Sequence, residues 1–161
     1  MKKFAVIAAT LLLALTGCTT QGGVEVSDAW VKSSDMSMVG GMTAVYGTIT
    51  NNTSNDVILI GGQTDVTSRV EIHEMAMSGG EMVMQKIEGG LRIPAGQSVT
   101  LEPGGNHMML MELSKAVVAG DTISVTFDLE GADDITIDSI MAKPTEGGDE
   151  NYHSEDMEMS N

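Results

Sequence analysis

Apolar and polar residues alternate along most of this chain, and no apolar repeat with a helical period persists over the length of a helix. Alternation of period two is typical of β-strands with one buried face, whereas an amphipathic helix needs apolar residues three or four positions apart. Turn-forming pairs such as Asn51-Asn52, Gly61-Gly62 and Gly89-Gly90 separate the alternating segments. We therefore predict strands over Val24 to Lys32, Thr43 to Asn51, Val57 to Ile60, Arg69 to Met77, Glu81 to Ile87, Ser98 to Leu101, His107 to Glu112, Thr122 to Leu129 and Ile135 to Met141.

Short strands separated by frequent turns are typical of a β-sandwich or barrel. We predict one all-β domain of this kind, immunoglobulin-like in architecture, over residues 24–143. Aromatic residues make up only 3% of the chain, so the core is expected to consist of Val, Ile, Leu and some Met. Trp30 and Tyr46 are expected to be its main large side chains.

The N-terminus has the pattern of an export signal. Lys2 and Lys3 precede an apolar stretch, Phe4 to Leu15, that is too short for a comfortable bilayer span. The stretch ends in Leu15-Thr16-Gly17-Cys18, which resembles the bacterial lipobox, in which the cysteine is acylated. The alternative is an ordinary signal peptide with a chance cysteine. We predict a signal peptide over residues 1–17, a lipidated tether over 18–23, and a protein anchored on the extracytoplasmic face of the membrane, periplasmic or cell-surface.

Cys18 is the only cysteine. The absence of cysteine from the rest of the chain excludes several classes of protein. Redox dithiol sites, cysteine hydrolases and blue-copper centres all need a cysteine in the folded domain. We expect no enzymatic activity. The chain carries 8 Lys and Arg against 23 Asp and Glu, a net charge of −15, so nucleic acid is not an expected partner.

The last segment, residues 144–161, is polar, acidic and without periodicity, and we expect it to be a disordered tail. It contains His153, Met157 and Met159. Imidazole and carboxylate suit Cu(II) and thioethers suit Cu(I), so one hypothesis is a second, flexible copper site. The other is an acidic solubilising tail in which these residues are incidental.

The chain contains 14 methionines, more than a small core needs, and all three histidines have a methionine nearby. Core packing is the expected role for Met42 and Met141, each of which lies in an apolar strand. The methionines beside His73 and His107 need another explanation.

Alternation predicts where these side chains point. In the strand from Arg69, Val70 and Ile72 share one face, while Glu71, His73 and Met75 share the other. Ser78-Gly79-Gly80 is short enough to fold this strand and the next into a hairpin, in which Met84 can lie beside His73. In the strand from His107, the residues His107, Met109 and Met111 share a face. If this strand meets the hairpin, a site of two imidazoles and two thioethers results: His73, Met84, His107 and Met109.

Thioether sulfur is soft and neutral, so such a site favours Cu(I) over Mg²⁺, Ca²⁺ or Zn²⁺. Methionine binds without losing a proton and is available where thiols would oxidise. The alternative is a pair of surface histidines and a loosely packed methionine core. We predict copper as the bound metal.

At these residues the chain resembles the periplasmic copper chaperone family, cupredoxin-like proteins with the motif His, ten residues, Met, about twenty-one residues, His, one residue, Met. His73 and Met84 have ten residues between them and His107 and Met109 have one; the middle gap holds twenty-two, which leaves Met82 as the alternative to Met84. Further similar segments are Asp28-Ala29-Trp30-Val31, Ala44 to Asn51, Val70 to Glu74 and Leu101 to Gly105.

The resemblance implies Cu(I) binding by His73, Met84, His107 and Met109. It also implies delivery of copper toward cytochrome c oxidase assembly, with a thiol-containing copper carrier or cytochrome c oxidase subunit II as acceptor. A copper buffer or scavenger without an acceptor would carry the same site. A mononuclear copper oxidase is disfavoured by the missing donors, and an adhesive sandwich domain would leave the histidine and methionine spacing to chance.

Overall fold

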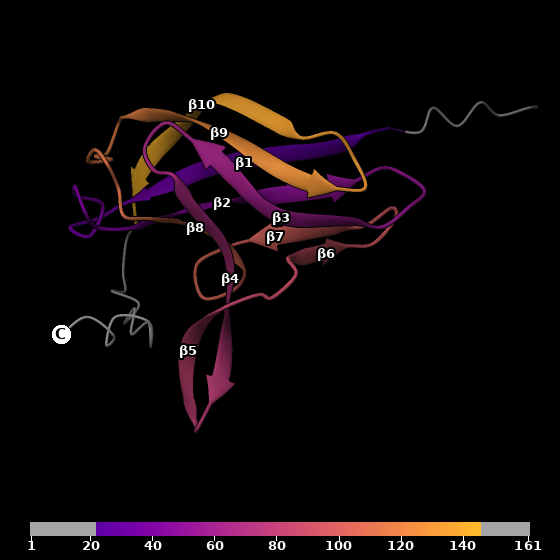
Figure 1. Cartoon of the computed structure of the whole chain (residues 1–161), viewed down its shortest axis with the longest axis horizontal. Coiled ribbons are helices and arrows are strands. Elements are labelled where there is room, and N and C mark those ends of the chain that lie inside the picture. Colours follow the sequence, from indigo (N-terminus) through magenta and orange to yellow (C-terminus); the bar gives the residue numbers. More distant parts are fainter. Residues whose placement is uncertain (1–21, 146–161) are drawn as a thin grey trace, which may run out of the picture.

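A computed structural model describes residues 22–145, and this part of the chain consists of strands and loops without a helix (Figure 1). The strands are β1 (Val24–Ser33), β2 (Thr43–Asn51), β3 (Val57–Thr64), β4 (Arg69–Ser78), β5 (Glu81–Lys86), β6 (Leu91–Ile93), β7 (Ser98–Leu101), β8 (His107–Met111), β9 (Thr122–Glu130) and β10 (Ile135–Pro144). The all-β prediction is confirmed.

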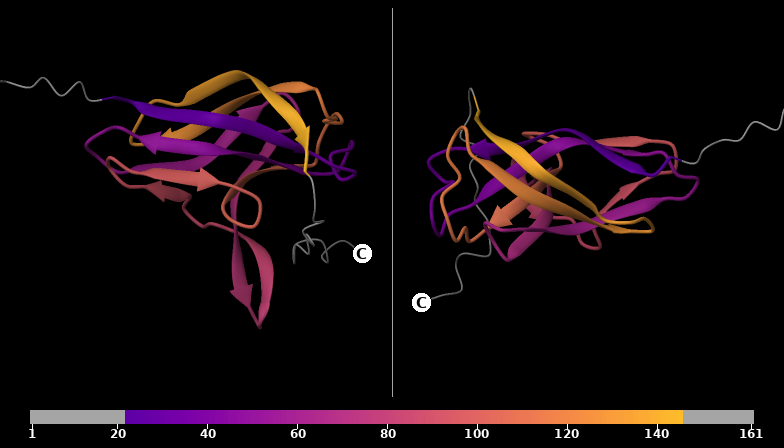
Figure 2. Two further views of the ribbon diagram at one scale, coloured as in Figure 1. Left: turned by 180° about the vertical axis from the view of Figure 1, so that it is seen from behind. Right: turned by 90° about the horizontal axis from the view of Figure 1, so that it is seen from above.

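Hydrogen bonds join the strands in the order β5-β4-β8-β2-β1-β10-β9-β3-β6, and β7 pairs with another part of β2. Only the β1–β10 pair is parallel among the described strands. Figure 1 and the left view of Figure 2 show an elongated body from which the hairpin of β4 and β5 projects.

The main core lies inside this body. Every strand except β5 contributes a buried side chain to it, among them Val31, Val45, Leu59, Ile72, Ile93, Leu101, Met108, Val125 and Ile140. Its large aromatic residue is Phe127. The prediction for the large side chains is confirmed for Tyr46, which is 1% exposed, whereas Trp30 is only partly buried. Alternation turns both away from the main core to the opposite face of the sheet, where they join a second hydrophobic cluster.

The two methionines expected to pack in the core behave differently. Met42 is buried, although in the second cluster. Met141 is 51% exposed, because it lies on the outer face of β10 between the inward-facing Ile140 and Ala142. Core packing was therefore the wrong expectation for Met141.

Two strand predictions need correction. The strand β6 was missed because three residues are too few to show alternation. Strand β3 was expected to end at Ile60, but it continues through Gly61-Gly62 to Thr64. A Cβ atom at Gly62 would lie 2.5 Å from the carbonyl oxygen of Thr126 on β9. These glycines therefore mark a bulged strand and a close backbone approach and not a turn.

Candidate metal centre

The strands β4 and β8 each divide their side chains between two clusters. Val70 and Ile72 of β4 pack with the main core, as do Met108 and Leu110 of β8. Met75, Met109 and Met111 belong to the second cluster on the other face of the sheet. The predicted alternation is therefore confirmed, and it carries Glu71, His73 and His107 to the methionine side.

Strand register then brings the predicted residues together. His73 and His107 are direct partners in the β4–β8 pair, and Glu71 is opposite Met109. The two imidazole rings lie edge to face, with centroids 5.8 Å apart and planes at 63°. In the β4–β5 hairpin, Met75 is opposite Met84.

The second cluster, called the methionine cluster below, is a small apolar layer around the two histidines. Its buried members are Met42, Ala44, Tyr46, Met84, Met109 and Met111, with Trp30 and Met75 packed against them. The Tyr46 ring contacts Trp30 at a centroid distance of 4.6 Å and lies 6.5 Å from the His107 ring. His73 is 6% exposed and His107 is 1% exposed, so both imidazoles are largely removed from water.

The orientation of His107 is fixed by the turn that precedes β8. Its Nδ1 atom lies 3.0 Å from the carbonyl oxygen of Gly105. A carbonyl oxygen can only accept, so Nδ1 carries the proton and donates it. Nε2 of the neutral ring then holds the lone pair, and this atom lies 3.2 Å from the sulfur of Met84. Two lone-pair atoms thus face each other at a distance that suits a shared cation.

That turn depends on its own backbone geometry. The amide of Glu102 donates to the carbonyl of Asn106 at 2.8 Å, which closes the loop. Gly104 has φ +77°, a conformation that side chains with a Cβ rarely adopt. The loop therefore places Gly105 so that its carbonyl selects the Nδ1–H form of His107.

The orientation of His73 is set by Glu71 on the same face of β4. The Nε2 atom of His73 lies 3.0 Å from Oε2 of Glu71, whose other oxygen accepts a hydrogen bond from Nε of Arg69 at 2.9 Å. Burial raises the pKa of Glu71, but hydrogen bonds from His73 and Arg69 outweigh it and hold the pKa below its ordinary value. The carboxylate is thus ionised, and it accepts a hydrogen bond from Nε2–H of His73.

Nδ1 of His73 is consequently the lone-pair nitrogen of that ring. It is buried and has no hydrogen-bond partner among residues 22–145. A buried polar atom without a partner costs free energy unless something satisfies it. Carboxylate-to-imidazole hydrogen bonds of the Glu71–His73 type are the usual outer support of metal-binding histidines.

The hairpin distinguishes the two candidate methionines of β5. Met84 is 7% exposed and contacts His107, whereas Met82 is 50% exposed and pairs with Met77 near the hairpin turn. Met84 is therefore the methionine of β5 that the structure brings into contact with His107.

The sequence interpretation missed two supporting groups, the Glu71 carboxylate and the Gly105 carbonyl. Glu71 could have been found, because it shares a face with His73 two residues away. The Gly105 carbonyl carries no sequence signal. The predicted residues Cys18, His153, Met157 and Met159 lie outside the described residues.

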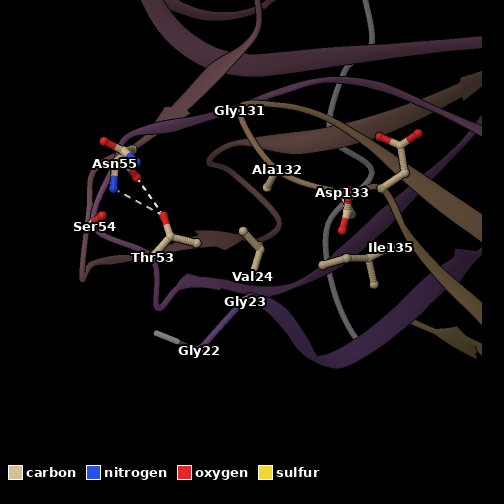
Figure 3. A pocket seen from close by; sticks show the side chains of 11 residues that line it. Gly22, Gly23, Val24, Thr53, Ser54, Asn55, Gly131, Ala132, Asp133 and Ile135 are labelled. Carbon is tan, nitrogen blue, oxygen red and sulfur yellow. Dashed lines mark hydrogen bonds between the residues drawn. The ribbon is translucent and has the colours of Figure 1, made fainter. Parts of the chain in front are cut away.

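A surface pocket lies away from this centre. It is lined by residues 22–24, 53–55 and 131–135, which are mostly small or polar (Figure 3). Neither imidazole nor sulfur lines it. Among residues 22–145, no group of three or more His, Cys, Asp or Glu side chains is arranged to hold a metal ion. The same residues form no helix long and apolar enough to cross a bilayer.

Comparison with known proteins identifies relatives along nearly the whole chain. A protein-family model described as "Putative lipoprotein LpqE-like" matches residues 24–140. The "Putative lipoprotein Lxx21020" of Leifsonia xyli subsp. xyli is 37% identical over 160 residues, covering 92% of this chain and 93% of its own.

Solved structures share the fold. The copper-bound PCuAC domain from PmoF2 matches with a TM-score of 0.62 and 23% identity, covering 76% of this chain and 95% of that domain. The apo solution structure of DR1885 from Deinococcus radiodurans matches with a TM-score of 0.54 and 27% identity, covering 90% of this chain and 95% of its own. The fold of residues 22–145 is thus that of a PCuAC domain.

Proposed function

This chain belongs to the LpqE-like lipoprotein family, and from that premise we propose that it is a lipid-anchored protein that binds one Cu(I) ion through His73, Met84, His107 and Met109. Copper is its cargo and not the cofactor of a reaction. The proposal assigns no catalytic role to any residue.

One observation carries the proposal: each buried histidine has one ring nitrogen committed as a donor to an oxygen, which leaves the other nitrogen with its lone pair in a cluster of thioethers. For His107 that nitrogen is Nε2, beside Met84, and for His73 it is the buried Nδ1. Metal-binding histidines need this protonation state, since the nitrogen that binds the ion must carry no proton.

The donor set favours Cu(I) over other ions. Two neutral thioethers and two neutral imidazoles add no negative charge, and the one nearby carboxylate, Glu71, is already paired with Arg69. A divalent ion would gain little electrostatic stabilisation from these uncharged donors, whereas the soft monovalent Cu(I) ion binds thioether sulfur well. Burial beneath the methionine cluster also keeps water, a hard ligand, away from the ion.

The comparison with solved structures supports copper as the ion. The PCuAC domain from PmoF2 was solved with copper bound. At 23% identity the likeness extends to the fold, so the choice of ligands rests on the residues of this chain.

X-ray absorption at the copper edge of the Cu(I)-loaded protein tests the site. The expected first shell contains both nitrogen and sulfur, because imidazole and thioether donors contribute together. The variant in which His107 and Met109 are both replaced by Ala should lose high-affinity binding. A shell of oxygen and nitrogen alone, or wild-type affinity in the double variant, would contradict the assignment.

We further propose that the protein delivers its copper to an acceptor outside the cytoplasm. A thiol-containing copper carrier or cytochrome c oxidase subunit II is the expected acceptor, on the basis of the family resemblance seen in the sequence. Transfer from the loaded protein to the purified acceptor, followed by metal analysis of both after separation, tests delivery. Retention of copper by a protein that binds it tightly would favour a buffer or scavenger.

A further inference from the structure

The β4–β5 hairpin extends outside the body of the domain, and no strand other than β4 pairs with β5 in the described structure (Figure 1). Its two strands are joined by Gly79-Gly80, with φ of +61° and +94°. Two consecutive residues with positive φ fit a type I′ turn, which produces a tight and regular hairpin. The register is therefore well defined out to the tip.

This register stacks methionines on one face of the hairpin. Met77 is opposite Met82, Met75 is opposite Met84, and His73 is in the next row on β4. Residues two positions apart along a strand share a face, so all five side chains lie on the same side. Directly opposite residues have Cβ atoms about 5 Å apart, close enough for two thioethers to bind one ion. Successive rows are about 7 Å apart.

Among these five side chains, burial increases from the tip of the hairpin to its base. Met77 is 66% exposed and Met82 is 50% exposed at the tip, while Met84 is 7% exposed and His73 is 6% exposed at the base. Met75 is half-buried and packs against the methionine cluster. A continuous series of thioethers thus connects solvent with the two histidines.

Packing does not explain the methionines at the tip. Neither Met77 nor Met82 belongs to the main core or to the methionine cluster. On the other face of the hairpin, polar pairs flank Ala76 and Val83. There Gln85 donates a hydrogen bond to Glu74 at 2.9 Å. Paired exposed thioethers on an otherwise solvated hairpin point to a ligand with affinity for sulfur.

We propose that Met77 and Met82 form a second, weaker Cu(I) site, through which copper enters and leaves the buried centre by way of Met75 and Met84. This inference rests on the proposed function, since it requires a buried Cu(I) site. Each step exchanges one neutral thioether for another, so copper remains Cu(I), no electron moves and no proton is released. Two thioethers leave coordination positions open at the tip for a donor from the protein that supplies or accepts copper.

The first test observes the methionines directly, in the full-length protein labelled with ¹³C at the methionine methyl groups and titrated with Cu(I) under reducing conditions. The first equivalent should shift the methyl signals of Met84 and Met109, and further copper should shift those of Met77 and Met82. Met36, Met38 and Met141 are comparably exposed but stand outside the hairpin, and serve as internal controls. Shifts at Met77 and Met82 no larger than at these controls would overturn the tip site.

The second test measures the rate of copper exchange with a coloured Cu(I) chelator. Replacing Met77 and Met82 by Leu removes both sulfurs while preserving volume. This M77L/M82L variant should load and release copper several-fold more slowly than wild type, with unchanged equilibrium affinity of the buried site. The matched control, M36L/M38L, should exchange at the wild-type rate.

The two tests separate this inference from the proposed function. Failure of the wild-type protein to bind Cu(I) tightly would overturn the buried site itself. Tight wild-type binding with equal exchange rates in M77L/M82L and M36L/M38L would overturn only the route through the tip.

Discussion

The Nε2 atom of His107 lies 3.2 Å from the sulfur of Met84, although β4 lies between the strands that carry them. The two side chains meet over the face of β4 that also carries His73. Because Nδ1 of His107 donates its hydrogen bond to the Gly105 carbonyl, the contact joins two lone-pair atoms. This contact distinguishes Met84 from its neighbour Met82.

The first prediction follows from this contact. Replacing Met84 by Leu removes the sulfur and keeps the volume, so the fold should tolerate it at a cost below about 1.5 kcal/mol. Cu(I) affinity should fall by at least about 10-fold, the lower end of the loss seen when even an outer partner of a metal ligand is removed. Competition with a Cu(I) chelator measures this.

Met82→Leu is the matched control for this experiment. It makes the same chemical change two residues away on the same face of β5. Its equilibrium affinity at the buried Cu(I) site should equal that of wild type. A larger loss in Met82→Leu than in Met84→Leu would show that the ligand had been assigned to the wrong methionine.

The second prediction concerns the stability of the copper-free protein. The pKa of Glu71 lies below its ordinary value of 4.5 because hydrogen bonds from His73 and Arg69 outweigh the effect of burial. A lowered folded pKa gives stability that is complete above the unfolded value and is lost as pH falls through the folded value. Glu71→Gln should therefore destabilise the fold by about 1–3 kcal/mol at pH 7, as expected for hydrogen bonds to a charged group.

Urea denaturation of wild type and Glu71→Gln at neutral and acidic pH checks this. The difference between the two proteins should shrink as the pH falls below 4.5, where Glu71 becomes protonated in the unfolded chain and then in the folded one. A difference that stays constant with pH would mean that the glutamine acts through packing and not through the loss of charge.

The third prediction is that acid weakens Cu(I) binding. Protons compete with copper for imidazole nitrogen, and free imidazole has a pKa of about 6.5, whereas thioethers take up no proton in this range. Affinity should therefore fall as the solution becomes more acidic. Chelator competition across the pH range measures the slope, and affinity that stays constant into acid would argue against imidazole ligands.

The sequence was enough to predict which face of its strand each side chain occupies. It was not enough to predict which residue of the neighbouring strand lies beside it. Alternation alone predicts that Val70 and Ile72 lie on one face of the sheet and His73 on the other. It likewise predicts that Met108 and Met109 lie on different faces. Nothing in the sequence states that His73 is paired with His107, because register across β4 and β8 depends on how the whole sheet closes. The choice between Met82 and Met84 likewise depends on how far along the hairpin the body of the domain reaches.

Backbone groups were the other source of error. Gly61-Gly62 has the composition of a turn, yet the pair allows β3 to approach β9 closely. Gly105 acts through its backbone carbonyl oxygen, a group that every residue has. Its role is therefore recognisable only from the position of that oxygen beside His107. The tautomers of both histidines, which carry the functional argument, could therefore be inferred only from the hydrogen-bond partners seen in the structure.

The fourth prediction concerns the membrane anchor. Cys18 is the only cysteine in the chain, so Cys18→Ser should abolish acylation and release the protein from the detergent phase in a partitioning experiment. Mass spectrometry of the N-terminal peptide identifies the lipid on the wild-type protein. A correctly processed Cys18→Ser protein that still partitions with detergent would indicate another form of attachment.

The last prediction concerns the C-terminal segment, in which His153, Met157 and Met159 stand among acidic residues. Imidazole and carboxylate donors suit Cu(II). If the segment is the disordered tail expected from its sequence, it must lose conformational entropy when it closes around an ion. Any site there should consequently be weaker than the buried Cu(I) centre. A chain that ends at Lys143 should keep one tight Cu(I) equivalent and lose one weaker Cu(II) equivalent, as measured by titration in each oxidation state. Equal stoichiometry for the full and shortened chains in both states would mean that the acidic segment serves solubility and binds no copper.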